Sequence, residues 1–178
     1  MSQYKIIFTG PVGAGKTTAI KSISDMPPIQ TEASASDMTK IRKPSTTVAM
    51  DYGIMNLADG GKIHLYGTPG QERFDFMWDI LTTGGIGLVL LLDNTRADPF
   101  KDMKFFLEAF KKFIGETGVA IGITQMDISS KPTIADYHKQ LLASDFKPPI
   151  FAVDARTKDD VSLLVQALLY ALDPGLAD

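Results

Sequence analysis

A nine-residue segment near the amino terminus has the residue types of a phosphate-binding loop. Residues 10–18 read Gly-Pro-Val-Gly-Ala-Gly-Lys-Thr-Thr, which satisfies the pattern G-x-x-x-x-G-K-[ST] between a strand-like run and a helical segment. The glycines allow several backbone N–H groups to converge, and a helix N-terminus adds partial positive charge there. We expect Lys16 to neutralise the terminal phosphates of a nucleotide and the Thr17 hydroxyl to ligate Mg²⁺. The alternative is a glycine-rich turn that only caps a helix, but the four fixed positions match by chance in only roughly one chain in a hundred. The nucleotide-binding residues predicted by the motif are Gly10, Gly13, Ala14, Gly15, Lys16, Thr17 and Thr18.

Two polar residues farther along the chain could complete a nucleotide site. Asp127 follows an apolar run, and at the end of a strand its carboxylate could accept two N–H groups from a guanine edge, a donor pair that adenine lacks. Its alternative role is that of a turn-forming aspartate before Ile128. Gln71 follows Gly70 in a loop-like segment, and near phosphates its amide could orient an attacking water.

Short apolar runs must form the strands that position these residues. Two of them flank the turn Ala58-Asp59-Gly60-Gly61 and predict a hairpin. Since helical patterns separate the others, the sequence predicts an α/β fold with a six-stranded, mostly parallel sheet and one antiparallel edge strand. The six runs are 4–9, 48–57, 62–66, 86–92, 119–124 and 149–153.

Helical patterns with start signals alternate with these runs, and about five helices are expected. Asp98-Pro99 begins one whose apolar face continues to Ile114, residues 133–141 begin with a capping-box pattern, and residues 161–172 carry the last apolar stripe. Residues 26–46 break the alternation with three prolines and few large apolar side chains. A segment of this length and composition predicts a long, functional loop.

Composition limits the classes of protein to which the chain can belong. With 178 residues, 44% hydrophobic and 22% charged, it fits a single globular domain, 1–178, with a sizeable core. The absence of cysteine excludes a disulfide framework, and the net charge of −3 argues against a surface for nucleic acid. The run 86–92 is too short to cross a bilayer, and no signal peptide or lipid-anchor motif is recognised. We therefore expect a cytoplasmic protein without a membrane span or lipid anchor.

The motifs, in their order and spacing, resemble those of Ras-like small GTPases. Residues 65–73 are similar to the switch II motif of Rab and Arf proteins, with five identities in seven aligned positions. Residues 45–52 resemble the end of switch I, with Thr47 at the threonine that binds Mg²⁺. Thr124-Gln125-Met126-Asp127 stands at the family's guanine motif, asparagine-lysine-x-aspartate, and Asp154-Ala155-Arg156 at its serine-alanine-lysine motif.

The resemblance implies a P-loop NTPase with a Ras-like three-layer fold. It implies a molecular switch that binds GTP and GDP with Mg²⁺, hydrolyses GTP slowly and with help from a partner, and has switch loops 26–47 and 67–84. By the same resemblance Gln71 and Lys16 are catalytic, and Thr17 and Thr47 hold the metal. The nucleotide-binding residues that it adds are Thr47, Gly70, Thr124, Gln125, Asp127, Asp154, Ala155 and Arg156.

The chain departs from the family pattern at several of these positions. Gly67 replaces the aspartate that holds Mg²⁺ through water, so the metal would rely on Thr17, Thr47, phosphate oxygens and water. Val12 replaces a glycine that leaves room for an arginine finger, and Arg42 is the best candidate for a finger within this chain. Without that aspartate, the proline-glycine-glutamine sequence is similar to that of the bacterial gliding-motility GTPases. That branch implies a small roadblock-fold protein as a regulator.

Two other functions are compatible with the motifs. Asp93 follows the apolar run 86–92 as a Walker B aspartate would, which predicts an ATPase or small kinase. Alternatively, Gly67 and Val12 could mark a GTP-binding module with little or no hydrolysis. In either a switch or a module, an apolar cluster after Gln71 could form a partner surface, because one helix face cannot bury all of its members. The cluster comprises Phe74, Phe76, Met77 and Trp78.

Overall fold

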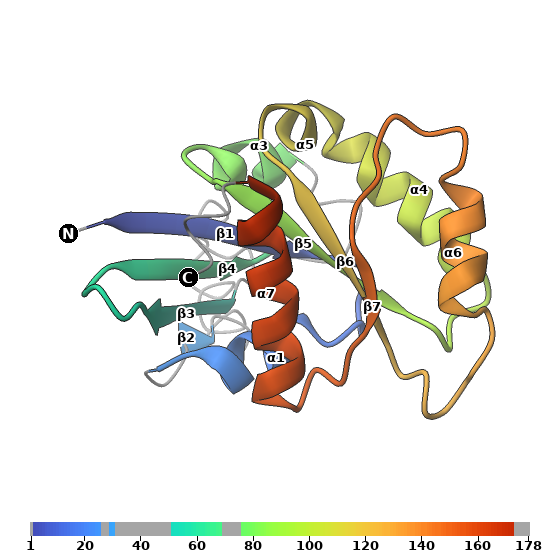
Figure 1. The fold of residues 1–178 in the computed structure, drawn as a ribbon, viewed down its shortest axis with the longest axis horizontal. Coiled ribbons are helices and arrows are strands. Elements are labelled where there is room, and N and C mark those ends of the chain that lie inside the picture. Colours follow the sequence, from blue (N-terminus) through green and yellow to red (C-terminus); the bar gives the residue numbers. More distant parts are fainter. Residues whose placement is uncertain (1, 26–28, 31–50, 69–75, 173–178) are drawn as a thin grey trace, which may run out of the picture.

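The computed structural model describes residues 2–25, 29–30, 51–68 and 76–172, which form a sheet between two layers of helices (Figure 1). The strand order is β2-β3-β4-β1-β5-β6-β7, in which β3 pairs antiparallel with its neighbours and the pairs from β4 to β7 are parallel. The strands are β1 (Gln3–Thr9), β2 (Ile29–Gln30), β3 (Asp51–Asn56), β4 (Lys62–Gly67), β5 (Gly87–Asp93), β6 (Val119–Thr124) and β7 (Ile150–Ala152).

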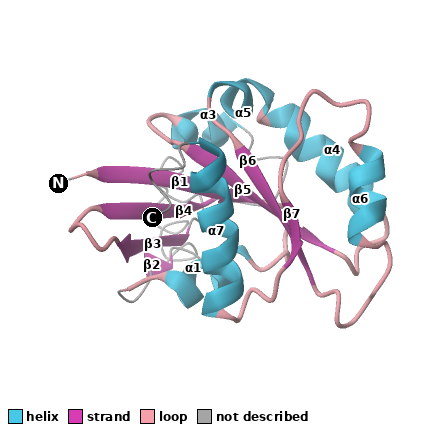
Figure 2. Cartoon of the chain, viewed as in Figure 1, coloured by secondary structure: helices cyan, strands magenta, loops and turns pink. Residues whose placement is uncertain are grey.

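The alternation of side chains along the strands builds two cores. In β1, Ile6 and Phe8 belong to the core cluster under α1 and α7, whereas Ile7 belongs to the cluster under the other helices. Figure 2 shows α1 and α7 on the viewer's side of the sheet. The helices are α1 (Lys16–Ile23), α3 (Phe76–Thr82), α4 (Pro99–Ala109), α5 (Lys111–Glu116), α6 (Ile134–Gln140) and α7 (Lys158–Leu172).

The predicted α/β fold with a mostly parallel sheet is confirmed, with two local differences. The segment predicted as one helix from Asp98 to Ile114 is divided into α4 and α5 at Phe110, whose backbone is not helical. A two-residue strand, β2, lies beyond β3 in a segment for which the sequence predicts only a loop. A run of two residues is too short to give a periodic signal.

The local signals at helix starts act as the sequence indicates. Asp98 caps α4 by accepting a hydrogen bond from the Lys101 N–H, and Thr133 forms a reciprocal capping box with Asp136 at α6. No helix in the described part of the chain combines the length and apolar character needed to cross a membrane.

Candidate nucleotide-binding site

The glycines of the phosphate loop are required by close packing and by backbone conformation. Gly10 has φ +146°, and a Cβ atom there would lie 2.1 Å from the carbonyl oxygen of Leu91. Gly15 is left-handed at φ 100° and precedes α1 without a side-chain cap. The N–H groups of the first helical turn are therefore left without a capping side chain, which suits the oxygens of a phosphate.

Lys16 is held against the mouth of this loop. Its Nζ donates hydrogen bonds to the carbonyls of Gly10 and Pro11 at 2.7 and 2.9 Å, and the side chain is buried. A buried ammonium group beside converging N–H groups gives the loop a concentrated positive potential.

Thr17 contacts a residue that the sequence analysis missed. Its hydroxyl donates to Oδ2 of Asp51 at 2.5 Å, and Asp51 is only 6% exposed at the start of β3. Burial raises the pKa of Asp51, while the Thr17 hydrogen bond and the charge of Lys16 oppose that rise. The sequence signal that could have identified it is a single charged residue within the run 48–57.

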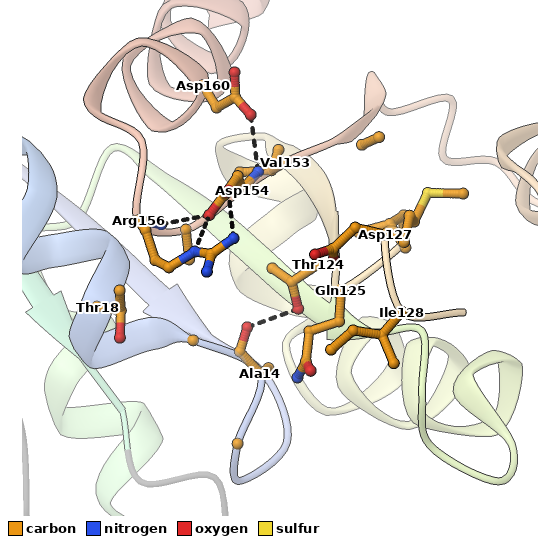
Figure 3. A pocket seen from close by; sticks show the side chains of 16 residues that line it. Ala14, Thr18, Thr124, Gln125, Asp127, Ile128, Val153, Asp154, Arg156 and Asp160 are labelled. Atoms are coloured by element: carbon orange, nitrogen blue, oxygen red, sulfur yellow. Dashed lines mark hydrogen bonds and ion pairs between the residues drawn. The ribbon is translucent and has the colours of Figure 1, made fainter. Parts of the chain in front are cut away.

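A cavity of about 410 Å³ adjoins the phosphate loop at the carboxyl ends of β6 and β7 (Figure 3). Ligands of open α/β sheets bind at this edge. Three segments that are distant in sequence meet there, and they include Gly13, Ala14, Gly15, Thr18, Thr124, Gln125, Asp127, Asp154, Ala155 and Arg156.

The side chain of Thr124 joins β6 to the phosphate loop. Its hydroxyl donates to the carbonyl of Ala14 at 2.9 Å and, less closely, to that of Leu92 at 3.2 Å. Thr124 is 3% exposed, so this wall of the cavity and the loop are held together by a buried hydrogen bond. Gln125, next in the chain, is the one non-glycine residue with positive φ (62°) in the described part of the chain.

Asp154 and Arg156 form a bidentate ion pair at the opposite side of the cavity from Asp127 (Figure 3). The Arg156 Nε and a terminal nitrogen each lie 2.9 Å from an Asp154 oxygen, and the Arg156 backbone N–H also donates to the carboxylate. These bonds lower the pKa of Asp154 to about 2. The hydrogen bond to Asp154 raises the pKa of Arg156, and the charges of Asp154 and, more weakly, of Asp127 add to the rise. The carboxylate predicted to read the base thus has a cation within its electrostatic range.

The loop that carries Asp127 is supported by Asn94, the residue that follows β5. Asn94, 2% exposed, donates to the carbonyls of Ser129 and Pro132 at 2.7 and 3.0 Å, and its own oxygen accepts the Tyr137 hydroxyl at 2.6 Å. The sequence does not single out Asn94, because an asparagine after a strand is common in turns.

The structure thus brings the phosphate loop, residues 124–127 and residues 154–156 around one cavity. Thr47, Gly70 and Gln71, and the proposed finger Arg42, lie outside the described residues. Among the described residues no group of three or more histidine, aspartate or glutamate side chains is arranged to hold a metal. Mg²⁺ takes hard oxygen ligands, and the described residues beside the phosphate loop offer the hydroxyl of Thr17 and the carboxylate of Asp51.

The apolar cluster after Gln71 is described only in part. Trp78 is 3% exposed, and its ring stacks on Phe110 with centroids 4.9 Å apart, so it does not contribute to an exposed partner surface. Phe74 and the side chains of Phe76 and Met77 lie outside the described structure.

Asp93, the aspartate of the ATPase alternative, accepts hydrogen bonds from Thr95 within a local turn. A single oxygen of its carboxylate accepts both the backbone N–H and the hydroxyl of Thr95, at 2.8 and 2.6 Å. This local pairing is that of an Asx turn, and it accounts for a buried aspartate at that position without a metal.

Sequence comparisons relate this chain to Ras-related proteins. Ras-related protein RABD2c of Arabidopsis thaliana is 20% identical over 179 residues, which cover 98% of this chain and 82% of that protein. Ras-related protein RabC of Dictyostelium discoideum is 21% identical over 176 residues, which cover 96% and 84%. This weak similarity over nearly the whole chain supports a P-loop protein of the Ras-like superfamily with a nucleotide-binding function.

Two further comparisons match proteins whose descriptions do not mention Ras. Uncharacterized protein MJ1339 of Methanocaldococcus jannaschii is 31% identical over 94 residues. The aligned residues cover 53% of this chain and 53% of that protein, so the chain spans about half the length of this relative. A family model described as "Conserved hypothetical ATP binding protein" matches residues 27–172, which begin just after the phosphate loop and α1. Since this match covers most of the sequence, the chain belongs to the family of conserved hypothetical ATP binding proteins.

Proposed function

We propose that the protein is a guanine-nucleotide switch, a single domain over residues 1–178 that binds GTP and GDP with Mg²⁺ and hydrolyses GTP slowly. The observation that carries this proposal is the shared cavity, in which the phosphate loop and Asp127 line one space of about 410 Å³. Phosphates would occupy the loop end, where Lys16 and the N-terminus of α1 supply positive charge. The base would then lie toward residues 124–128 and 154–156.

Asp127 supports guanine over adenine. An ionised carboxylate accepts two parallel N–H bonds from a guanine edge, whereas adenine would leave it facing a polar edge without that donor pair. The Thr124 hydroxyl is bonded to the phosphate loop, which leaves Asp127 as the principal base reader on this side. On the other side, Ala155 and the paired Asp154 and Arg156 would enclose the base.

Slow, partner-assisted hydrolysis is part of the proposal. Gln71 would orient water, Lys16 would neutralise charge, and Thr17 with Thr47 would hold Mg²⁺. Binding of the γ-phosphate would order the switch segments 26–47 and 67–84. The resemblance to the gliding-motility GTPases supports a roadblock-fold protein as the regulator at these segments.

A second candidate is an ATP-binding protein, because the family model that matches this chain is described as ATP binding. Competition for a fluorescent GDP analogue separates the two functions. We expect GTP and GDP to displace the analogue at concentrations at least about 30-fold lower than ATP, the factor that corresponds to 2 kcal/mol. Equal displacement by ATP and GTP would contradict guanine selection. Single-turnover phosphate release from bound GTP then distinguishes an enzyme from a module that only binds.

A further inference from the structure

Asp51 and Gly67 face each other on neighbouring strands beside the phosphate loop. The β3–β4 ladder pairs Tyr52 with Tyr66, so the next position brings Asp51 opposite Gly67. A Cβ atom on Gly67 would lie 3.1 Å from Cδ1 at the flexible end of Ile20, 3.3 Å from the Asp51 Cβ and 3.4 Å from its Oδ2. Side chains at positions 51 and 67 would therefore crowd each other. Because Gly67 on β4 has no side chain, the space between the two strands is left to the carboxylate of Asp51 on β3.

The contacts of that carboxylate are incomplete. Oδ2 accepts the hydroxyl proton of Thr17, and the positive charge of Lys16 lies within electrostatic range. Oδ1 is buried and has no hydrogen-bond partner among the described residues. A buried carboxylate oxygen without a partner carries a desolvation penalty, so its position calls for a donor or a cation.

A hydrated magnesium ion would supply the missing interaction. Mg²⁺ binds through few protein oxygens, substrate phosphates and several retained waters, whose O–H groups need acceptors. Because the Thr17 proton points to Asp51, the lone pairs of the Thr17 oxygen remain available for a metal. Carboxylates that accept hydrogen bonds from metal ligands orient those ligands and increase their affinity.

We propose that Asp51 is the carboxylate of the Mg²⁺ site, supplied by β3 because β4 has Gly67 at the opposite position. Oδ2 orients the Thr17 hydroxyl, and Oδ1 accepts a hydrogen bond from a water of the magnesium shell. Asp51 is thus a positioning residue that acts through Thr17 and water. The inference rests on the proposed function only in requiring a nucleotide with Mg²⁺ on the phosphate loop, and it is independent of which base is bound.

The experiment measures how much Mg²⁺ slows the release of a fluorescent GDP analogue from the full chain, compared with release in EDTA. The variant Asp51→Asn retains the shape and removes the charge. We expect its Mg²⁺ affinity to be weaker by roughly 10- to 100-fold, the range for such supporting residues, with an unchanged release rate in EDTA. The double variant Asp51→Gly/Gly67→Asp exchanges the two residues and returns one carboxylate to the same space, so we expect it to recover most of the Mg²⁺ effect.

Asp136→Asn is the matched control. Asp136 is likewise an aspartate with a threonine partner, and its bonds to Thr133 are confined to the capping box at the start of α6, outside the cavity lining. We expect the Mg²⁺ dependence of this variant to equal that of the unmodified protein.

The possible results separate the inference from the proposed function. Three results would each overturn the role of Asp51: undiminished Mg²⁺ affinity in Asp51→Asn, release of the analogue that is equally faster with and without Mg²⁺ in that variant, or loss of the Mg²⁺ effect in Asp136→Asn. Failure of the exchanged variant to recover the effect while it remains folded would also overturn it. If the protein binds an ADP analogue and not GDP, guanine selection fails, and the same measurement with ADP still tests Asp51. Absence of binding of either nucleotide would overturn both.

Discussion

The hydroxyl of Thr124 donates a hydrogen bond to the carbonyl of Ala14 at 2.9 Å, across 110 positions of the chain. This bond joins β6, the strand before residues 125–128, to the loop that we propose binds phosphates. The two ends of the cavity therefore share one buried contact, and its removal should affect both stability and nucleotide binding.

Thr124→Val tests this connection. Valine keeps the shape but leaves the carbonyls of Ala14 and Leu92 without this donor, so we expect a loss of about 1–3 kcal/mol in the free energy of unfolding and faster release of GDP. Denaturant unfolding and stopped-flow release measure the two effects. Thr117→Val is the control, since the Thr117 hydroxyl also donates to a backbone carbonyl but lies at the end of α5. If Thr124→Val released GDP at the same rate as the unmodified protein, the proposed effect of the Thr124–Ala14 hydrogen bond on nucleotide binding would be contradicted.

Gly10→Ala should destabilise the fold severely. The added Cβ would lie 2.1 Å from the Leu91 carbonyl oxygen, and the φ of +146° is unfavourable for alanine. We expect a loss of more than about 3 kcal/mol in denaturant unfolding. Gly115→Ala provides the contrast, because Gly115 lies within α5 with no atom within 4 Å of the added Cβ. It should gain about 0.5–1 kcal/mol, and a comparable loss at both glycines would contradict the packing argument.

Asp127→Ala should weaken guanine binding by about 2–3 kcal/mol, the contribution of hydrogen bonds to a charged group. Titration calorimetry with GDP measures this change. Asp145→Ala removes the same charge at an exposed position outside the cavity lining and should leave the affinity unchanged. Equal effects of the two substitutions would assign the change to net charge and remove Asp127 from base recognition.

Gln71→Leu should slow single-turnover hydrolysis of GTP by about 100-fold or more, because leucine cannot orient the attacking water. Binding of GDP should remain close to that of the unmodified protein. Arg42→Ala, measured in the same assay, tests whether a finger acts within the chain. Rates equal to the unmodified rate in both variants would remove both residues from the mechanism.

The pair of Asp154 and Arg156 predicts a specific pH dependence. The pKa of Asp154 is about 2, below its ordinary value of 3.8, so the folded state binds this proton more weakly than the unfolded state. Its contribution to stability is fully present above pH 3.8 and is lost as the pH falls toward 2. In Arg156→Ala the pKa should return toward 3.8, which an NMR titration of the Asp154 carboxyl would detect. An unchanged pKa would show that Arg156 is not the cause.

The sequence predicts those parts of the fold and site that have local signals. The strand 119–124 agrees residue for residue with β6, and the glycine pattern of residues 10–18 predicts the phosphate loop, because each depends on neighbouring residues alone. The role proposed for Asp51 depends on a residue opposite it on another strand, and the support given by Asn94 depends on carbonyls more than 30 positions away. Such relationships arise from tertiary packing and leave no periodic pattern.

The support that Asn94 gives to the loop after β6 has a consequence for how the proposed site distinguishes one base from another. Because the buried amide of Asn94, the residue after β5, holds two of this loop's carbonyls, Asp127 should meet a nucleotide in an arrangement that is fixed in advance. Little conformational entropy would then be lost on binding, and base discrimination would occur at first encounter. A substitution at Asn94, outside the cavity lining, would loosen that arrangement and lower the ratio of guanine to adenine affinity while every residue of the lining stayed the same.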